Sequence, residues 1–141
     1  MATNDTGSMN QKYMELEMVN QRLQELNNAL QQIDNEIEHA QVALTTLGEI
    51  TKSDENSELL IPLGSETFLT VKAEDVKNVR QSVGAGVVVD KSTNDAIQNI
   101  EKQLEETKKH REEYSKVYNE VVQKAEELQK SIESDISKQK S

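Results

Sequence analysis

The chain has no cysteine and no tryptophan, and its 141 residues include one proline, one phenylalanine and three tyrosines. Without cysteine it can form neither a disulfide nor a thiolate metal site, which favours a cytosolic setting. Hydrophobic residues make up 34% of the chain, against roughly 45–50% in ordinary globular domains. Because so little apolar material cannot build a compact core of ordinary size, the sequence predicts an elongated protein.

Positive charge is also scarce, since 16 Lys and Arg face 26 Asp and Glu and the net charge is −10. Nucleic-acid binding requires clustered Lys and Arg, so no nucleic-acid partner is expected. No stretch approaches the roughly 18 consecutive apolar residues of a membrane span. The first residues also lack the basic and apolar regions of a signal peptide. We therefore expect a cytoplasmic protein with no membrane partner.

Apolar residues in the first third of the chain recur at alternating spacings of three and four. They are Leu16, Val19, Leu23, Leu26, Leu30, Ile33, Ile37, Ala40, Leu44 and Leu47. This alternation is the heptad seam of a coiled coil. The sequence therefore predicts an N-terminal coiled-coil helix over residues 9–52, preceded by a disordered N-terminus at residues 1–8.

A second seam with the same alternation occupies the last third. Its members are Ile97, Ile100, Leu104, Thr107, Arg111, Tyr114, Tyr118, Val121, Ala125, Leu128 and Ile132. Thr107 and Arg111 are poor seam residues, so we expect the arm to be locally loose there. Ser92 and Asp95 have the spacing of a helix start. A C-terminal coiled-coil helix is predicted over residues 92–137, with a disordered tail at 138–141, and the two helices are expected to fold back as an antiparallel coiled-coil hairpin.

Between the seams the apolar period changes to two. A polar linker at residues 53–58 precedes residues 59–91, where β-branched residues alternate with others and turn residues interrupt at even spacing. Four short strands in two β-hairpins are predicted, with turn glycines at Gly64, Gly84 and Gly86 that can adopt positive φ without strain. The fold class is therefore α+β.

The same glycines could instead open a phosphate-binding loop. Such a loop lies between a strand and a helix, whereas Gly86 precedes Val87-Val88-Val89, which predicts a strand. No nucleophile and base can be assembled either, so we predict no catalytic residue, no cofactor and no enzyme. His39 and His110 have glutamates near them in sequence, but on so acidic a surface a solvated pair is expected and no metal site.

The strands should not be stable alone. Ordering about thirty residues costs roughly 1–2 kcal/mol each in backbone entropy, more than the few apolar side chains recover. Separate hairpins also leave strand edges unpaired. We therefore predict an assembly surface that other subunits complete. Its residues are Leu59, Ile61, Leu63, Phe68, Leu69, Val71, Val79, Val83, Val87 and Val89.

Apolar residues also gather where the chain ends would meet in an antiparallel hairpin. Several lie off the seam, and methionine there suits a surface that binds varied apolar partners. The candidate residues of this tip are Met9, Tyr13, Met14, Met18, Ile132 and Ile136. The alternative is that scattered methionines are merely tolerated on a frayed helix end.

The central motifs carry a family resemblance. Ile61-Pro62-Leu63-Gly64 at a strand end, Val-Gly-Ala-Gly from Val83 to Gly86, and Asp95-Ala96 at the entry to the second helix all occur between two coiled-coil arms. This arrangement, over residues 9–137, resembles the α-class subunit of prefoldin, particularly the archaeal type. The arms alone would be shared with any coiled coil.

The resemblance implies a hexamer of two α-class and four β-class subunits joined through a double β-barrel platform, to which α-class chains bring two hairpins. It further implies an ATP-independent chaperone whose coiled-coil tips hold unfolded polypeptides and deliver them to a group II chaperonin. Some prefoldin-like chains assemble into filaments of one subunit type, so a homo-oligomeric scaffold remains the alternative.

Overall fold

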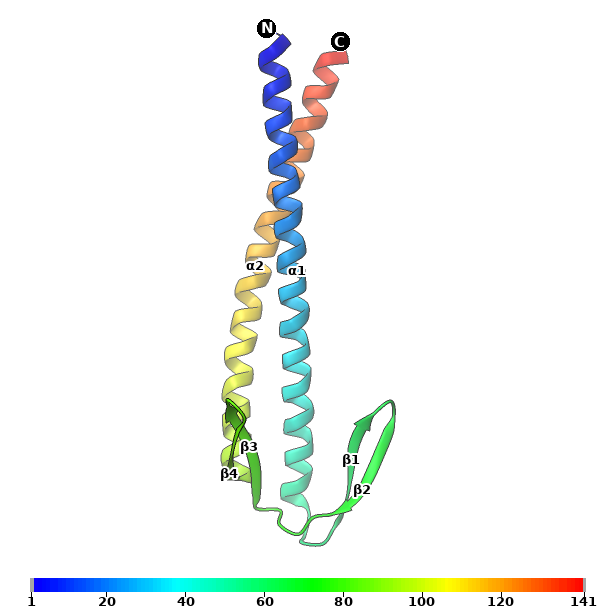
Figure 1. Cartoon of the computed structure of the whole chain (residues 1–141), viewed down its shortest axis with the longest axis vertical. Coiled ribbons are helices and arrows are strands. Elements are labelled where there is room, and N and C mark those ends of the chain that lie inside the picture. The colour runs from blue at the N-terminus through cyan, green and yellow to red at the C-terminus, as the bar shows by residue number, and fades with distance from the viewer. Residues whose placement is uncertain (1, 141) are drawn as a thin grey trace. The chain divides into compact units, whose positions relative to one another are not determined.

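The computed structural model describes residues 2–140, and their side chains from residue 7 to residue 139. Two long helices flank four strands in the order α1, β1, β2, β3, β4, α2 (Figure 1). The strands form two separate two-stranded antiparallel sheets, β1 with β2 and β3 with β4. The predicted α+β class, with two long helices and two central hairpins, is confirmed.

The helices extend beyond their predicted ends. Helix α1 spans Ala2–Lys52 and helix α2 spans Thr93–Lys140. Residues 2–8 and 138–140, predicted as disordered, are thus helical in the structure, while residues 1 and 141 lie outside the described part. The first segment lacks proline, and a single glycine such as Gly7 costs a helix only about 1 kcal/mol. Nothing in that segment therefore forces the helix to begin later.

The start of α2 is fixed by side-chain and backbone hydrogen bonds. The backbone N–H of Asp95 donates to Ser92 Oγ at 3.1 Å, which confirms the predicted cap. Thr93, which is buried, donates from its hydroxyl to the Val76 carbonyl at 2.9 Å and from its N–H to the Lys77 carbonyl at 2.7 Å. These bonds tie the beginning of α2 to the segment that leads into β3.

The chain divides into two compact units. Among the described residues, the arm unit contains 2–35 and 108–140, and the hairpin unit contains 36–107. In the arm unit the N-terminal end of α1 contacts the C-terminal end of α2, so the helices are antiparallel, as predicted. The seam residues there are buried or half-buried, except Arg111 and Tyr114 in α2, which are exposed.

In the hairpin unit, β1 is Glu58–Gly64, β2 is Thr67–Lys72, β3 is Asn78–Gly84 and β4 is Val87–Ser92. The two hairpins repeat one design at an offset of 20 residues. Ile61 pairs with Leu69 and Gln81 with Val89, and each ladder shifts register at the same place, before Gly64 and before Gly84. Both hairpins therefore share one backbone geometry.

Each hairpin closes through a two-residue turn in which both residues have positive φ. In the second turn these residues are Ala85 and Gly86, at 51° and 75°, and in the first they are Ser65 and Glu66, at 49° and 57°. Gly64 and Gly84, at 104° and 102°, precede the two turns, so the three predicted turn glycines all use positive φ. Glu66 occupies in the first turn the position that Gly86 holds in the second.

Candidate functional site

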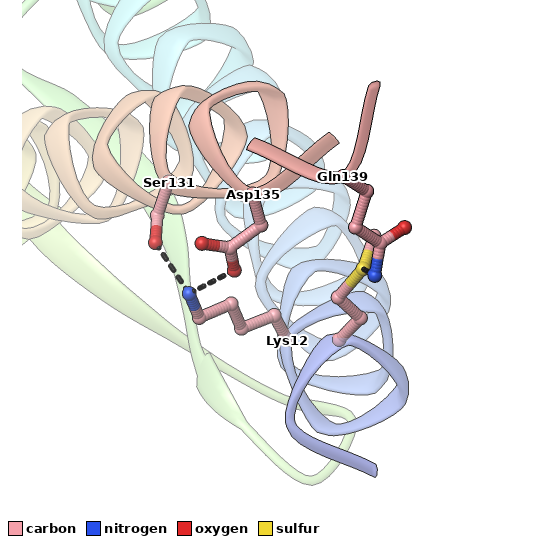
Figure 2. A network of polar contacts seen from close by, with 5 residues as sticks. Lys12, Ser131, Asp135 and Gln139 are labelled. Atoms are coloured by element: carbon pink, nitrogen blue, oxygen red, sulfur yellow. Dashed lines mark hydrogen bonds and ion pairs between the residues drawn. The ribbon is translucent and has the colours of Figure 1, made fainter. Parts of the chain in front are cut away.

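At the open end of the arm unit, a lysine in the seam bridges the two helices. Lys12 follows the seam spacing between Met9 and Leu16, and it is half-buried. Its Nζ donates to Ser131 Oγ at 2.7 Å and to Asp135 Oδ2 at 2.5 Å, both on α2 (Figure 2). Because the charge is met by a carboxylate and a hydroxyl, it can occupy a seam position that apolar residues otherwise hold.

One turn further out, Met9 also reaches α2. The Gln139 side-chain amide donates to the Met9 sulfur at 3.2 Å (Figure 2). Ser8, Met9, Lys12, Asp135, Lys138 and Gln139 line a pocket of about 360 Å³ here. Met9 is therefore half-buried, because this contact with α2 covers part of its side chain.

The predicted tip residues separate into an exposed and a covered group. Met14 and Met18 are 66% and 68% exposed, and Tyr13 is also exposed, all on the same stretch of α1. Ile132 is only 5% exposed because it lies in the seam between the helices, and Ile136 is half-buried. Ile132 is therefore largely covered in the free chain, and client binding by these six residues stays a prediction.

A shallow groove of about 470 Å³ runs beside Met18, between α1 and α2. Its lining residues are Glu15, Met18, Val19, Gln21, Arg22, Glu25, Val121 and Lys124. The lining combines three apolar side chains with one glutamine, two acidic residues and two basic residues. Arg22 and Glu25 also pair with each other at 3.4 Å. The sequence did not reveal this groove, because it depends on how the two helices face each other.

Arg111, expected to loosen the arm, has a partner on α1. Its Nε donates to Asp34 Oδ1 at 2.5 Å. This hydrogen bond, with the charge of Asp34, raises the pKa of the Arg111 guanidinium above its usual value. The exposed seam position is thus held by a cross-helix ion pair, and the sequence showed the unusual residue without showing its partner.

In the hairpin unit, each hairpin has one covered face and one open face. Half-buried residues mark the covered faces: Leu59, Ile61 and Val71 on the first hairpin, and Val79, Gln81, Val89 and Lys91 on the second. The remaining predicted assembly residues are exposed, namely Leu63, Phe68, Leu69, Val83 and Val87. Half of the predicted set is therefore open to a partner in the free chain.

Three residues that matter on these faces were missed from the sequence. Leu60 and Val88 are exposed apolar residues on the open faces, out of step with the period of two that selected their neighbours. Gln81 lies on a covered face, where the sequence pattern indicated only the valines around it. Its Oε1 is a buried acceptor without a hydrogen-bond partner in the described structure.

Two other classes of site can be addressed for residues 2–140. In this part of the chain, no group of three or more His, Cys, Asp or Glu side chains is arranged to hold a metal ion. No described helix is both long and apolar enough to cross a membrane.

Two long helices joined through two short antiparallel hairpins define a prefoldin-like coiled-coil subunit. The sequence pattern of the prefoldin subunit family matches residues 19–138, which include most of both helices and all four strands. The chain therefore belongs to the prefoldin family.

Curated archaeal relatives support the same placement. The chain is 30% identical to prefoldin subunit alpha of Methanococcus aeolicus over 125 residues, which is 89% of this chain and 85% of the relative. It is 32% identical to prefoldin subunit alpha 1 of Methanocaldococcus jannaschii over 130 residues, covering 92% and 89%. The suspected resemblance to an archaeal α-class prefoldin is confirmed at the level of these relatives.

A solved structure shares the fold. It is a chain of a filamentous PFD from Methanocaldococcus jannaschii, with a TM-score of 0.65, 22% identity, and coverage of 80% of this chain and 93% of that one. At that identity, the likeness concerns the arrangement of helices and hairpins alone.

Proposed function

We propose that this chain is the α-class subunit of a cytoplasmic hexameric prefoldin, an ATP-independent chaperone that holds unfolded polypeptides and delivers them to a group II chaperonin. Membership in the prefoldin family and the relatives named prefoldin subunit alpha support the class. The proposed role is binding, without a catalytic step.

The observation that carries the proposal is the exposed group Tyr13, Met14 and Met18 in the arm unit. Most apolar seam residues of the same unit are buried or half-buried without these three, so these three are not needed to hold the helices together. Methionine is flexible and polarizable and adapts to apolar partners of varied shape. An unfolded polypeptide presents such a varied set.

The contact at one arm is small, so holding a client requires several arms. Linked weak sites raise the overall affinity well above that of a single site, provided the client can reach them together. The proposed hexamer supplies several such arms. Release to the chaperonin is then possible because each single contact is weak.

Assembly is proposed to use the hairpins. Each sheet has only two strands, so the hairpins leave backbone donors and acceptors unpaired at their edges, next to exposed apolar residues such as Leu63 and Phe68. We propose that β-class subunits complete these sheets, in a complex of two α and four β chains.

The test replaces Tyr13, Met14 and Met18 together with serine in the assembled complex. Protection of a chemically denatured client from aggregation should fall severalfold, while the mass of the complex stays unchanged. The matched control is Val42→Ser, which removes another exposed apolar side chain of α1 from the hairpin unit. Equal protection by the triple variant and the control would remove these residues from the client surface.

A homo-oligomeric or filament-forming scaffold is the second candidate. The filamentous Methanocaldococcus jannaschii chain of similar fold favours it. Native mass spectrometry of the complex isolated from its own cells separates the two candidates. Two copies of this chain with four of a smaller subunit support the hexamer, whereas a ladder of this chain alone supports the scaffold.

A further inference from the structure

The two hairpins have the same backbone and different surfaces. Their registers coincide at the 20-residue offset, so Leu60 corresponds to Arg80, Ile61 to Gln81, and Thr70 to Asp90. A partner strand that recognised only backbone hydrogen-bonding groups could not distinguish them. Any selection between the two hairpins must therefore come from side chains.

The open faces differ in polarity. On the first hairpin, Leu60 is 65% exposed and lies beside Pro62 and Phe68, which face each other across the strands. At the corresponding place on the second hairpin, Arg80 and Asp90 are directly opposite and form an ion pair, Nε to Oδ1, at 3.4 Å. The open face of the first hairpin is therefore mainly apolar, whereas that of the second carries an exposed ion pair beside Val88.

The covered faces differ in polarity at two positions, because Gln81 corresponds to Ile61 and the half-buried Lys91 corresponds to Val71. Both hairpins contribute to an apolar groove of about 340 Å³ that the base of each helix also lines, with Leu47, Ile61, Gln81 and Ile100 among its residues. The apolar side chain of Ile61 suits this apolar groove. Gln81 does not, because its buried Oε1 accepts no hydrogen bond from any described residue. A buried acceptor in that state is unfavourable and is normally paired in a native structure.

We infer that the two hairpins accept chemically different strands from partner subunits, and that Gln81 sets the difference by requiring a hydrogen-bond donor. The occupant is a strand of another prefoldin-family chain, since each sheet has only two strands and leaves edges that a further strand can extend. At the second hairpin that strand supplies an N–H or O–H to Gln81 Oε1. It also presents charges complementary to Arg80 and Asp90, whereas the strand at the first hairpin is apolar.

The inference rests on the proposed assembly and extends it to the choice of partner surface. It predicts opposite effects of one substitution in two states of the protein. In Gln81→Leu the unpaired acceptor is gone, so the free chain should melt at the same temperature or slightly higher. In the complex the same variant loses the donated hydrogen bond.

The experiment compares wild type, Gln81→Leu and the matched control Ile61→Leu, which changes the corresponding position of the first hairpin. Each chain is mixed with the partner subunit that copurifies with the wild-type chain, and the concentration at which the complex dissociates is measured by native mass spectrometry. Gln81→Leu should dissociate at a concentration about fivefold higher or more, which is the effect of losing one hydrogen bond. The control should stay within about twofold of wild type.

A Gln81→Leu complex as stable as wild type would overturn the inference, as would equal weakening by the control. Failure of the proposed function looks different, because the wild-type chain would then form no complex with a second subunit type. If only homo-oligomers form, the same variants compared on those oligomers decide whether Gln81 requires a donor.

Discussion

The arm unit and the hairpin unit differ in how far their polar groups are paired and their apolar side chains covered within the chain. In the arm unit most seam residues are buried or half-buried, Lys12 has Asp135 and Ser131, and Arg111 has Asp34. In the hairpin unit both sheets stop at two strands, apolar residues such as Leu60 stay exposed, and the buried Gln81 oxygen lacks a donor. The polar groups of the first unit find partners within the chain, whereas the second leaves strand edges and apolar residues open in the free chain.

This difference assigns separate tasks to the two units. A unit that closes on itself can be held away from an assembly and still keep its structure. A unit that leaves strands and apolar faces open gains stability by association. Substitutions in the two units should therefore fail in different ways, and the following tests address that contrast.

The largest effect is expected from a charge placed in the hairpin unit. Leu69→Asp or Val87→Asp should abolish the complex, because association would bury an unpaired carboxylate. The helix content of the free chain should stay the same, since both residues are exposed on short hairpins outside the helices. Native mass spectrometry and circular dichroism measure the two properties. A complex of normal mass would contradict the placement of these strands at the interface.

A pair of leucines compares the units directly. Leu26 in the arm seam is 3% exposed, and Leu60 on the first hairpin is open. Leu26→Ala should lower the free energy of unfolding of the free chain by about 2–4 kcal/mol, as loss of a buried leucine does. Leu60→Ala should change it by less than about 0.5 kcal/mol and act on the complex instead. Urea unfolding measures both, and equal losses would remove the contrast.

The first turn offers a smaller gain. Glu66→Gly places glycine where φ is 57°, and should raise the free energy of unfolding by about 0.5–1 kcal/mol. The reverse change, Gly86→Glu, introduces the same strain into the second turn and should lower it by a similar amount. Because the hairpins are open in the free chain, the assembled complex is the better sample for thermal unfolding. A loss on Glu66→Gly would mean that the Glu66 side chain contributes more than its backbone costs.

The smallest effects are expected from the ion pairs. A double-mutant cycle on Lys12 and Asp135, which are half-buried, should give a coupling of about 0.5–1 kcal/mol. The same cycle on Arg80 and Asp90, both 82% exposed, should give less than about 0.3 kcal/mol in the free chain. A larger coupling for the exposed pair would show that the hairpin surface is more ordered alone than we expect.

Much of the fold could be predicted because its signals are periodic. Alternating spacings of three and four identified both seams, and Gly64, Gly84 and Gly86 identified the turns. The helix ends were less predictable. Residues 2–8 have weak helix propensity, with Gly7 but no proline, so neither a helix start nor a disordered segment is specified locally.

The candidate sites were predictable only where a residue stands out alone. Met14 and Met18 are conspicuous off the seam, and Arg111 is conspicuous on it. Their surroundings depend on which helix faces lie together. For that reason the sequence alone could not predict that Ile132 is covered, that Asp34 pairs with Arg111, or that a groove lies beside Met18. Gln81 was missed because the sequence does not show that its side-chain oxygen is buried without a hydrogen-bond partner.

The two cross-helix ion pairs of the arm limit how related chains can differ in length. Lys12 meets Asp135 and Arg111 meets Asp34, so α1 and α2 are fixed to each other at both ends of the stretch between these contacts. An insertion in one helix alone would displace one pair and rotate the seam away from its partner. We therefore expect lineages with longer or shorter arms to have gained or lost whole heptads, and to have done so in both helices at once.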